Sequence, residues 1–294
     1  MMYRNFLFSI FLVSAFALDC SQIPTSQISD GNTVYIPGPT SGPQAIPANF
    51  NCIYNISIPL GLYANVTLFN GLIGVNDFIL VTEVNGAQTR VTNRSISDCN
   101  QYQYFVVPGS FMTIQIITKS VFMNSQFSIT VDFHAAKVGP TFQMKTGGDM
   151  NYLDVVAWRN NDSLFSSQTY TGNEPLQLNV ASSWNNITMF EYCYIIDGTI
   201  GNMISLEKLG DTSIYQSQSN SITIVTFSND RLQFVLNPMS EARQVTSLLA
   251  THAEQDPEGF FFSSYGMKIT EALQVVNFDS TGITLDNLDI MSVS

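Results

Sequence analysis

The stretch FNCIYNISIPLGLYANVTLFNG, residues 50–71, contains two runs in which apolar and polar residues alternate. Successive side chains of a β-strand point to opposite faces, so this alternation predicts strands with one buried and one exposed face. The apolar row of the first run is Cys52, Tyr54, Ile56 and Ile58, and that of the second is Ala64, Val66 and Leu68. We expect one antiparallel pair, joined at the turn-like Pro59-Leu60-Gly61.

The same stretch holds two Asn-x-Ser/Thr triplets, which begin at Asn55 and Asn65. Both asparagines lie on the rows opposite the apolar ones, so we expect both sugars on the solvent-exposed face of this strand pair. Cys52 is expected to face the core. Further triplets begin at Asn93, Asn161 and Asn186. Together they predict a glycosylated protein, exposed to the secretory pathway.

The first 17 residues have the pattern of a secretory signal peptide. Arg4 gives a positive start, Phe6 to Phe16 form an apolar segment, and Ala15-Phe16-Ala17 is a small-x-small cleavage site. The alternative is a transmembrane anchor, but the apolar run is short for a span of about 20 residues. No later segment is long and apolar enough to span, and the tail lacks the hydrophobic segment of a GPI signal. We expect a secreted, extracellular protein.

Composition narrows the class of partner. Charged residues make up 12% of the 294-residue chain and the formal net charge is −12. Nucleic acids and anionic membranes require clustered Lys and Arg, so neither is an expected partner. The four cysteines are Cys20, Cys52, Cys99 and Cys193. In an oxidising compartment they indicate disulfides with three possible connectivities, and the absence of CxxC pairs argues against a zinc site.

Most of the first half is predicted as β-strand. Phe127, Ile129, Val131 and Phe133 alternate with polar residues, and residues 112–116 show the same pattern. The continuous apolar run 78–81 suits a strand covered on both sides, and Asn85-Gly86 after it is a hairpin signal. Residues 30–49 contain four prolines and look too broken for regular structure.

A domain boundary is expected near residues 137–140, which leaves a first domain at 18–136 and a second at 140–294. In the second half we expect strands at 152–158, 176–180, 187–196, 222–227, 232–236, 275–278 and 283–290. One helix is expected at 238–252, with Asn237 as N-cap and Pro238 at the first helical position. The fold class is therefore all-β, with a second β-rich domain, also a sandwich, and one helix.

The first half resembles a CUB domain, specifically the CUB-like family of secreted nematode proteins. The resemblance rests on the order of several short motifs behind the signal peptide. They are Cys20, Cys-Ile-Tyr-Asn-Ile-Ser-Ile-Pro from Cys52, Gly61-Leu62-Tyr63, the strand 64–69, Asn76-Asp77-Phe78-Ile79-Leu80-Val81, and the strand 128–133. Each motif is degenerate, and the match covers about residues 18–135.

This resemblance implies a jelly-roll β-sandwich in which Cys20 is bonded to Cys52. Cys99 and Cys193 would then remain as partners that connect the two halves; the alternatives are free thiols or intermolecular links. Many CUB domains bind calcium through an acidic cluster, and Asp77 matches one acidic position. The other acidic positions have no counterpart here, so Asp77 is a weak calcium candidate and we expect a structural role for it. No cofactor is expected.

A hydrolase is the main alternative to a binding protein. Neither histidine has a suggestive setting, and no Gly-x-Ser-x-Gly or His-Glu-x-x-His motif occurs. Paired carboxylates in the second half can still make a carbohydrate-active hydrolase, and the candidates are Asp149, Asp154, Glu191 and Asp197.

The leading hypothesis is a secreted, glycosylated and non-enzymatic protein for extracellular recognition or protection. The family resemblance implies a role in innate defence against microbes, with an unidentified extracellular protein or glycan as ligand. A structural component of an extracellular matrix is a further alternative.

Overall fold

The computed structural model describes residue 20 and residues 22–93, 100–119, 125–146, 151–154, 164–181, 192–209, 214–227, 233–242, 247–251 and 273–277. The predicted signal peptide and the predicted strand at 283–290 lie outside these residues.

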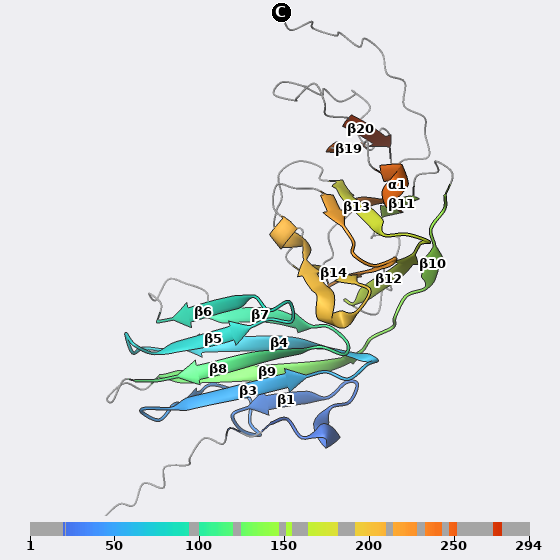
Figure 1. Cartoon of the computed structure of the whole chain (residues 1–294). Helices are drawn as coiled ribbons and strands as arrows, with labels where there is room; N and C mark the ends of the chain where they lie inside the picture. The colour runs from blue at the N-terminus through green and yellow to red at the C-terminus, as the bar shows by residue number, and fades with distance from the viewer. Residues whose placement is uncertain are drawn as a thin grey trace, which may run out of the picture.

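The first half is a sandwich of two antiparallel sheets (Figure 1). One sheet has the order β1 (Thr33–Ile36), β9 (Gln126–Ala135), β4 (Leu62–Gly71) and β7 (Gln101–Val106), with β2 (Gln44–Ala45) also paired to β9. The other has the order β3 (Asn51–Ser57), β8 (Phe111–Ile117), β5 (Phe78–Thr82) and β6 (Gln88–Thr92). A short 3₁₀ helix, η1 (Thr25–Gln27), precedes β1. The predicted jelly-roll-type, all-β fold is confirmed.

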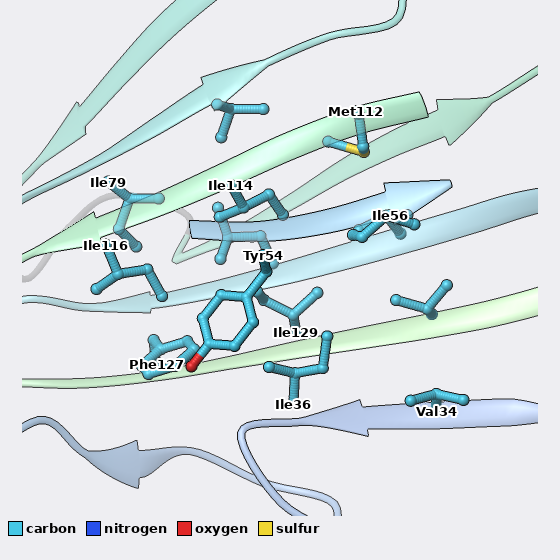
Figure 2. Packing of buried hydrophobic residues seen from close by; sticks show 14 of the residues in the cluster. Val34, Ile36, Tyr54, Ile56, Ile79, Met112, Ile114, Ile116, Phe127 and Ile129 are labelled. Atoms are coloured by element: carbon cyan, nitrogen blue, oxygen red, sulfur yellow. The ribbon is translucent and has the colours of Figure 1, made fainter. Parts of the chain in front are cut away.

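The apolar rows of both sheets meet in one core. The predicted buried residues of β3, β4 and β9 are all buried, as are Ile79 and Val81 of β5. Figure 2 shows Tyr54 of β3 lying beside Phe127 and Ile129 of β9 and Ile36 of β1. The Tyr54 and Phe127 ring centroids are 5.9 Å apart. Alternation therefore predicted correctly the core-facing side of β3, β4 and β9. The run 78–81, predicted to be covered on both sides, is buried only at Ile79 and Val81.

Two predictions for the first half are wrong. β3 and β4 do not pair: β3 pairs with β8 in one sheet, and β4 pairs with β7 and β9 in the other. The turn after β3 carries the chain across the core instead of closing a hairpin, and both apolar rows still face the core from opposite sides. The segment 30–49 also contains strands, because β1 and β2 both pair with β9.

The hairpin signal at Asn85-Gly86 is confirmed. β5 and β6 pair directly across it, Gly86 has a φ of 77°, and the Gly86 N–H donates to the Glu83 carbonyl over 2.9 Å. Glycine adopts this positive φ without a Cβ clash, which suits the tight turn.

Two larger sheets and a small two-stranded one make up the described second half. One sheet has the order β10 (Thr141–Gln143), β12 (Ser166–Thr171), β17 (Ser221–Thr226), β14 (Cys193–Asp197) and β15 (Met203–Ser205). The other has the order β11 (Asn151–Asp154), β18 (Gln233–Pro238), β13 (Leu176–Ala181) and β16 (Ile214–Gln216). Buried residues of both sheets share one core, which includes Leu178, Ile195, Ile224 and Phe234. Short 3₁₀ helices, η4 (Ile200–Asn202) and η5 (Leu206–Leu209), flank β15.

The long helix predicted at 238–252 is wrong. Pro238 ends β18, the helix α1 (Met239–Ala242) has four residues, and β19 (Ser247–Thr251) pairs in parallel with β20 (Leu273–Asn277). Leu248 and Leu249 have helical spacing from Val245 in the sequence. In the strand they pair with Gln274 and Val275, 26 positions later, which local spacing does not reveal.

An aromatic cluster joins the two halves. It combines Tyr63, Phe105 and Val107 from the outer face of the β4–β7 sheet with Phe165, Tyr194, Met203, Val225 and Phe227 from the second half. Phe105 and Phe227 stack with ring centroids 4.6 Å apart. The Tyr63 side of β4, predicted to be wet, is therefore partly covered by the second half.

Candidate functional site

Asp77 supports the loop between β4 and β5. Its side chain is only 1% exposed, and its two oxygens accept hydrogen bonds of 2.8 Å from the Lys119 N–H and from the Ser125 hydroxyl. The Ser125 oxygen in turn accepts from the Ile73 N–H over 3.0 Å. Asp77 thus connects two neighbouring loops at one end of the sandwich. Within the described part of the chain, no three His, Cys, Asp or Glu residues gather closely enough to hold a metal ion.

The structure places a disulfide between Cys20 and Cys52, whose Cα atoms are 5.6 Å apart. It does not place the expected second bridge: Cys193 is a free, buried thiol, and Cys99 lies outside the described residues. The reason is the register of β14, which directs Cys193 into the core of the second half and Tyr194 toward the first half. Burial raises the pKa of the Cys193 thiol and so disfavours its reactive thiolate.

Three predicted sugar acceptors lie in described parts of the chain. Asn55 is exposed on the outer face of β3, whereas Asn65 lies on the outer face of β4, in the other sheet. The two acceptors are therefore on opposite sides of the sandwich and not on one strand pair. Asn65 is half-buried opposite Phe105, and its side-chain oxygen accepts from Gln103 over 3.0 Å. Asn93 is exposed; Asn161 and Asn186 lie outside the described residues.

A groove of about 410 Å³ runs beside β1, at the edge of the first sandwich. One wall is formed by residues 22–27, the other by residues 32–39, and Tyr54 lies at its base. The Asn32 side-chain amide donates to the Gln27 carbonyl over 2.5 Å, so the two walls are tied to each other. This groove is a concave surface of the size that small ligands occupy.

Residues 15–137 match the CUB-like domain family. The first half of the chain is a CUB-like domain.

Solved structures with a distant overall likeness include the CUB1-EGF-CUB2 domains of rat MASP-1 and of human MASP-1/3. Each has 14% sequence identity and a TM-score of 0.27; they cover 70% of this chain and 96% and 98% of theirs. A structure described as the triple jelly roll fold and turret assembly of an archaeal virus has 13% identity and a TM-score of 0.23. It covers 70% of this chain and 58% of that one. A comparison with curated proteins finds no significant match.

The CUB-like domain belongs to a class of extracellular domains that mediate protein interactions and are typically non-catalytic. Of the helices in the described ranges, none has the length and apolar character needed to cross a membrane.

Of the four carboxylates considered for hydrolysis, only Asp197 has a side chain among the described residues. Asp197 is buried and bonded to Tyr215, Gln218 and Ser219, as a structural carboxylate would be. Asp149, Glu191 and the side chain of Asp154 lie outside the described part of the chain.

Sequence reasoning missed the groove of the CUB-like domain and the aromatic cluster. The groove was missed because the prolines near β1 concealed the alternation of Thr33-Val34-Tyr35-Ile36, a usable strand signal. The cluster carried no local signal, because an outward aromatic residue shows its burial only when the covering partner is in place.

Proposed function

We propose that this chain is a secreted, glycosylated and non-enzymatic protein that recognises partners outside cells, in innate defence against microbes. The observation that carries the proposal is the CUB-like domain at residues 15–137. Its position directly behind a signal-type segment supports secretion, and a disulfide fits an oxidising compartment.

The loop that Asp77 supports is a good surface for such recognition. Val75 is 86% exposed, and Ile73 beside it is half exposed, while the backbone of this loop is held by Asp77 and Ser125. Apolar side chains on a fixed backbone can be buried by a partner at a low entropic cost, because the loop is already ordered. This arrangement supports contact through loops at the end of the sandwich.

The test is a binding screen with the purified full chain against bacterial surfaces, immobilised glycans and extracellular proteins. We expect binding to at least one microbial surface, and weaker binding by I73S/V75S if the loop makes the contact. Leu60→Ser is the matched control, because Leu60 is an equally exposed loop residue outside the segment held by Asp77. Absence of binding across broad panels would contradict a recognition role.

A further inference from the structure

The groove beside β1 has an uncharged polar lining. Its described lining residues include no Asp, Glu, Lys, Arg or His. The groups available to a ligand are the side-chain amides of Gln22 and Gln27, the aromatic ring of Tyr35 and the proline rings. The Thr33 hydroxyl already donates to the Asp132 carboxylate over 2.6 Å, and the Asn32 amide donates to the Gln27 carbonyl. A ligand with a full charge would lose hydration here without gaining an opposite charge, so the lining favours a neutral, polar ligand.

Backbone groups of β1 add to this lining. The Phe133 N–H donates to the Asn32 carbonyl over 2.9 Å, so the Asn32 carbonyl points toward β9. Backbone groups alternate in direction along a strand, which turns the N–H and C=O of Thr33 and Tyr35 away from β9. Among the described residues β1 is the outermost strand on this side of its sheet, so these donors and acceptors point away from the sheet.

The groove is also preformed. Val34 and Ile36 point into the core, as Figure 2 shows, which fixes the outward direction of their neighbours on β1. The disulfide from Cys20 to Cys52 attaches the start of the residue 22–27 wall to β3, the strand that carries Tyr54 at the base. The entropic cost of ordering the site when a ligand binds is therefore small.

We propose that this groove binds a short neutral saccharide. Sugar hydroxyls both donate and accept hydrogen bonds, which matches side-chain amides and paired backbone groups. The apolar C–H face of a sugar ring can lie on the ring of Tyr35 or Pro37. The volume lies within the roughly 300–1,000 Å³ range of small-molecule sites. The inference rests on the proposed recognition function and names its ligand class.

An extended peptide added to the β1 edge is the competing occupant, and the chain disfavours it. β1 has only four residues and is followed by Pro37 and Pro39. Short edge strands that end in proline are a common protection against strand addition, because proline lacks the N–H that a new strand needs.

The test uses the full, ¹⁵N-labelled chain after enzymatic removal of its own N-linked sugars. Glucose, galactose, mannose, N-acetylglucosamine and their disaccharides are titrated, and binding is followed by saturation transfer and by amide shifts. We expect at least one sugar to shift the Thr33 and Tyr35 amides. Tyr35→Ala and the double variant Q22A/Q27A should each weaken binding about tenfold. Q115A is the matched control, because the Gln115 amide lies on the outer face of the opposite sheet. Sugar binding by Q115A should equal that of the parent protein.

The outcomes separate this inference from the proposed function. Failure of every neutral sugar, or sugar binding that the groove variants leave unchanged, would overturn the groove assignment. Shifts of the same β1 amides by an extended peptide without any sugar response would also overturn it. In each case, binding to microbial surfaces in the broader screen would still support the recognition function. Absence of that binding would contradict both the recognition function and the groove assignment.

Discussion

Asp197 in the second half shows how one buried carboxylate organises a turn. Its oxygens accept from the Tyr215 hydroxyl over 2.9 Å, the Gln218 N–H over 2.6 Å and the Ser219 N–H over 3.0 Å, and also from the Ser219 hydroxyl. Burial by itself would raise the pKa of this carboxyl, but hydrogen bonds from Ser219, Gln218 and Tyr215 lower it on balance. The charged form of Asp197 therefore stabilises the turn between β16 and β17.

Replacing Asp197 with Asn should destabilise the protein by about 2 to 3 kcal/mol, because an amide N–H would face backbone N–H donors. Chemical denaturation of the variant measures this loss. Glu207→Gln is the control, since Glu207 is exposed and its replacement should change the free energy of unfolding by less than about 0.5 kcal/mol. Equal stability of D197N and the parent protein would refute the structural role.

The lowered pKa of Asp197 also predicts an acid dependence. The folded-state pKa of Asp197 lies below the unfolded value of about 3.9. The stability that the charged carboxylate contributes is therefore fully present above that pH. The contribution disappears as the pH falls through the lowered folded value. The difference in stability between the parent protein and D197N should therefore shrink between about pH 5 and pH 2. A difference that stays constant over this range would contradict the assignment.

Asn55 gives a residue-scale test of glycosylation. Its side chain is exposed on the outer face of β3, so the acceptor amide is open to solvent. In protein secreted from eukaryotic cells, the Asn55→Gln variant should lack the mass of one N-linked glycan. Its free energy of unfolding should differ from that of the parent protein by less than about 0.5 kcal/mol. Intact-mass spectrometry measures the first effect. An unchanged mass would show that this acceptor is unused.

At the scale of elements, the turn at residues 58–61 decides how the CUB-like domain is assembled. Gly61 has a φ of 88°, and its carbonyl accepts from the Ala136 N–H over 2.8 Å, just beyond the end of β9. This turn sends β4 to the opposite sheet from β3. The alternation of both strands is the same for a hairpin and for this crossing, so alternation alone did not distinguish them.

Removing the bridge that anchors β3 should weaken the CUB-like domain. Cys20 and Cys52 are 32 positions apart, and closing a loop of this length contributes about 3 to 4 kcal/mol in the chain-entropy estimate. In denaturant unfolding, the free energy of unfolding of the C20S/C52S variant should be lower than that of the parent protein by about this amount. Under reducing conditions, the stability of the parent protein should approach that of the variant. Peptide mapping of the unreduced protein is the check, because a link from either cysteine to Cys99 would refute the pairing.

At the scale of the whole molecule, we propose that residues 18–136 and 140–294 are two domains held together by the aromatic cluster. Phe227 is its centre: it lies 4.6 Å from Phe105 and 5.5 Å from both Tyr63 and Phe165, between ring centroids. The Tyr192 hydroxyl also donates to the Gln103 carbonyl over 3.3 Å, across the same contact. A buried apolar contact of this kind restricts relative motion of the two halves.

Phe227→Ala should lower the free energy of unfolding by about 3 to 5 kcal/mol, because Phe227 is 3% exposed and its ring is surrounded by aromatic side chains. We expect the calorimetric transition of the parent protein to separate into two in the variant, since the halves would no longer stabilise each other. Phe111→Ala is the matched control, because Phe111 is 59% exposed and its loss should leave one transition. A single transition in F227A would contradict this coupling.

Local patterns predicted the buried faces of β3, β4 and β9, the β5–β6 turn and the CUB-like character of the first half. They did so because side-chain direction in a strand follows from backbone geometry alone. They missed β12, Ser166–Thr171, because its residues are almost all polar. In the structure β12 is a central strand, and its Thr169 hydroxyl is 2.8 Å from that of Thr223 on β17.

The sequence by itself therefore determined which residues of this protein avoid water and that they do so in strands. Only the tertiary structure decided which strands pair, that Asn55 and Asn65 lie on opposite sheets, and that Tyr63 is covered by Phe227. The physical reason is that alternation is set by bonds between neighbouring residues. Strand partners, grooves and contacts between the two halves depend instead on residues far apart in the chain, which meet only when the whole molecule folds.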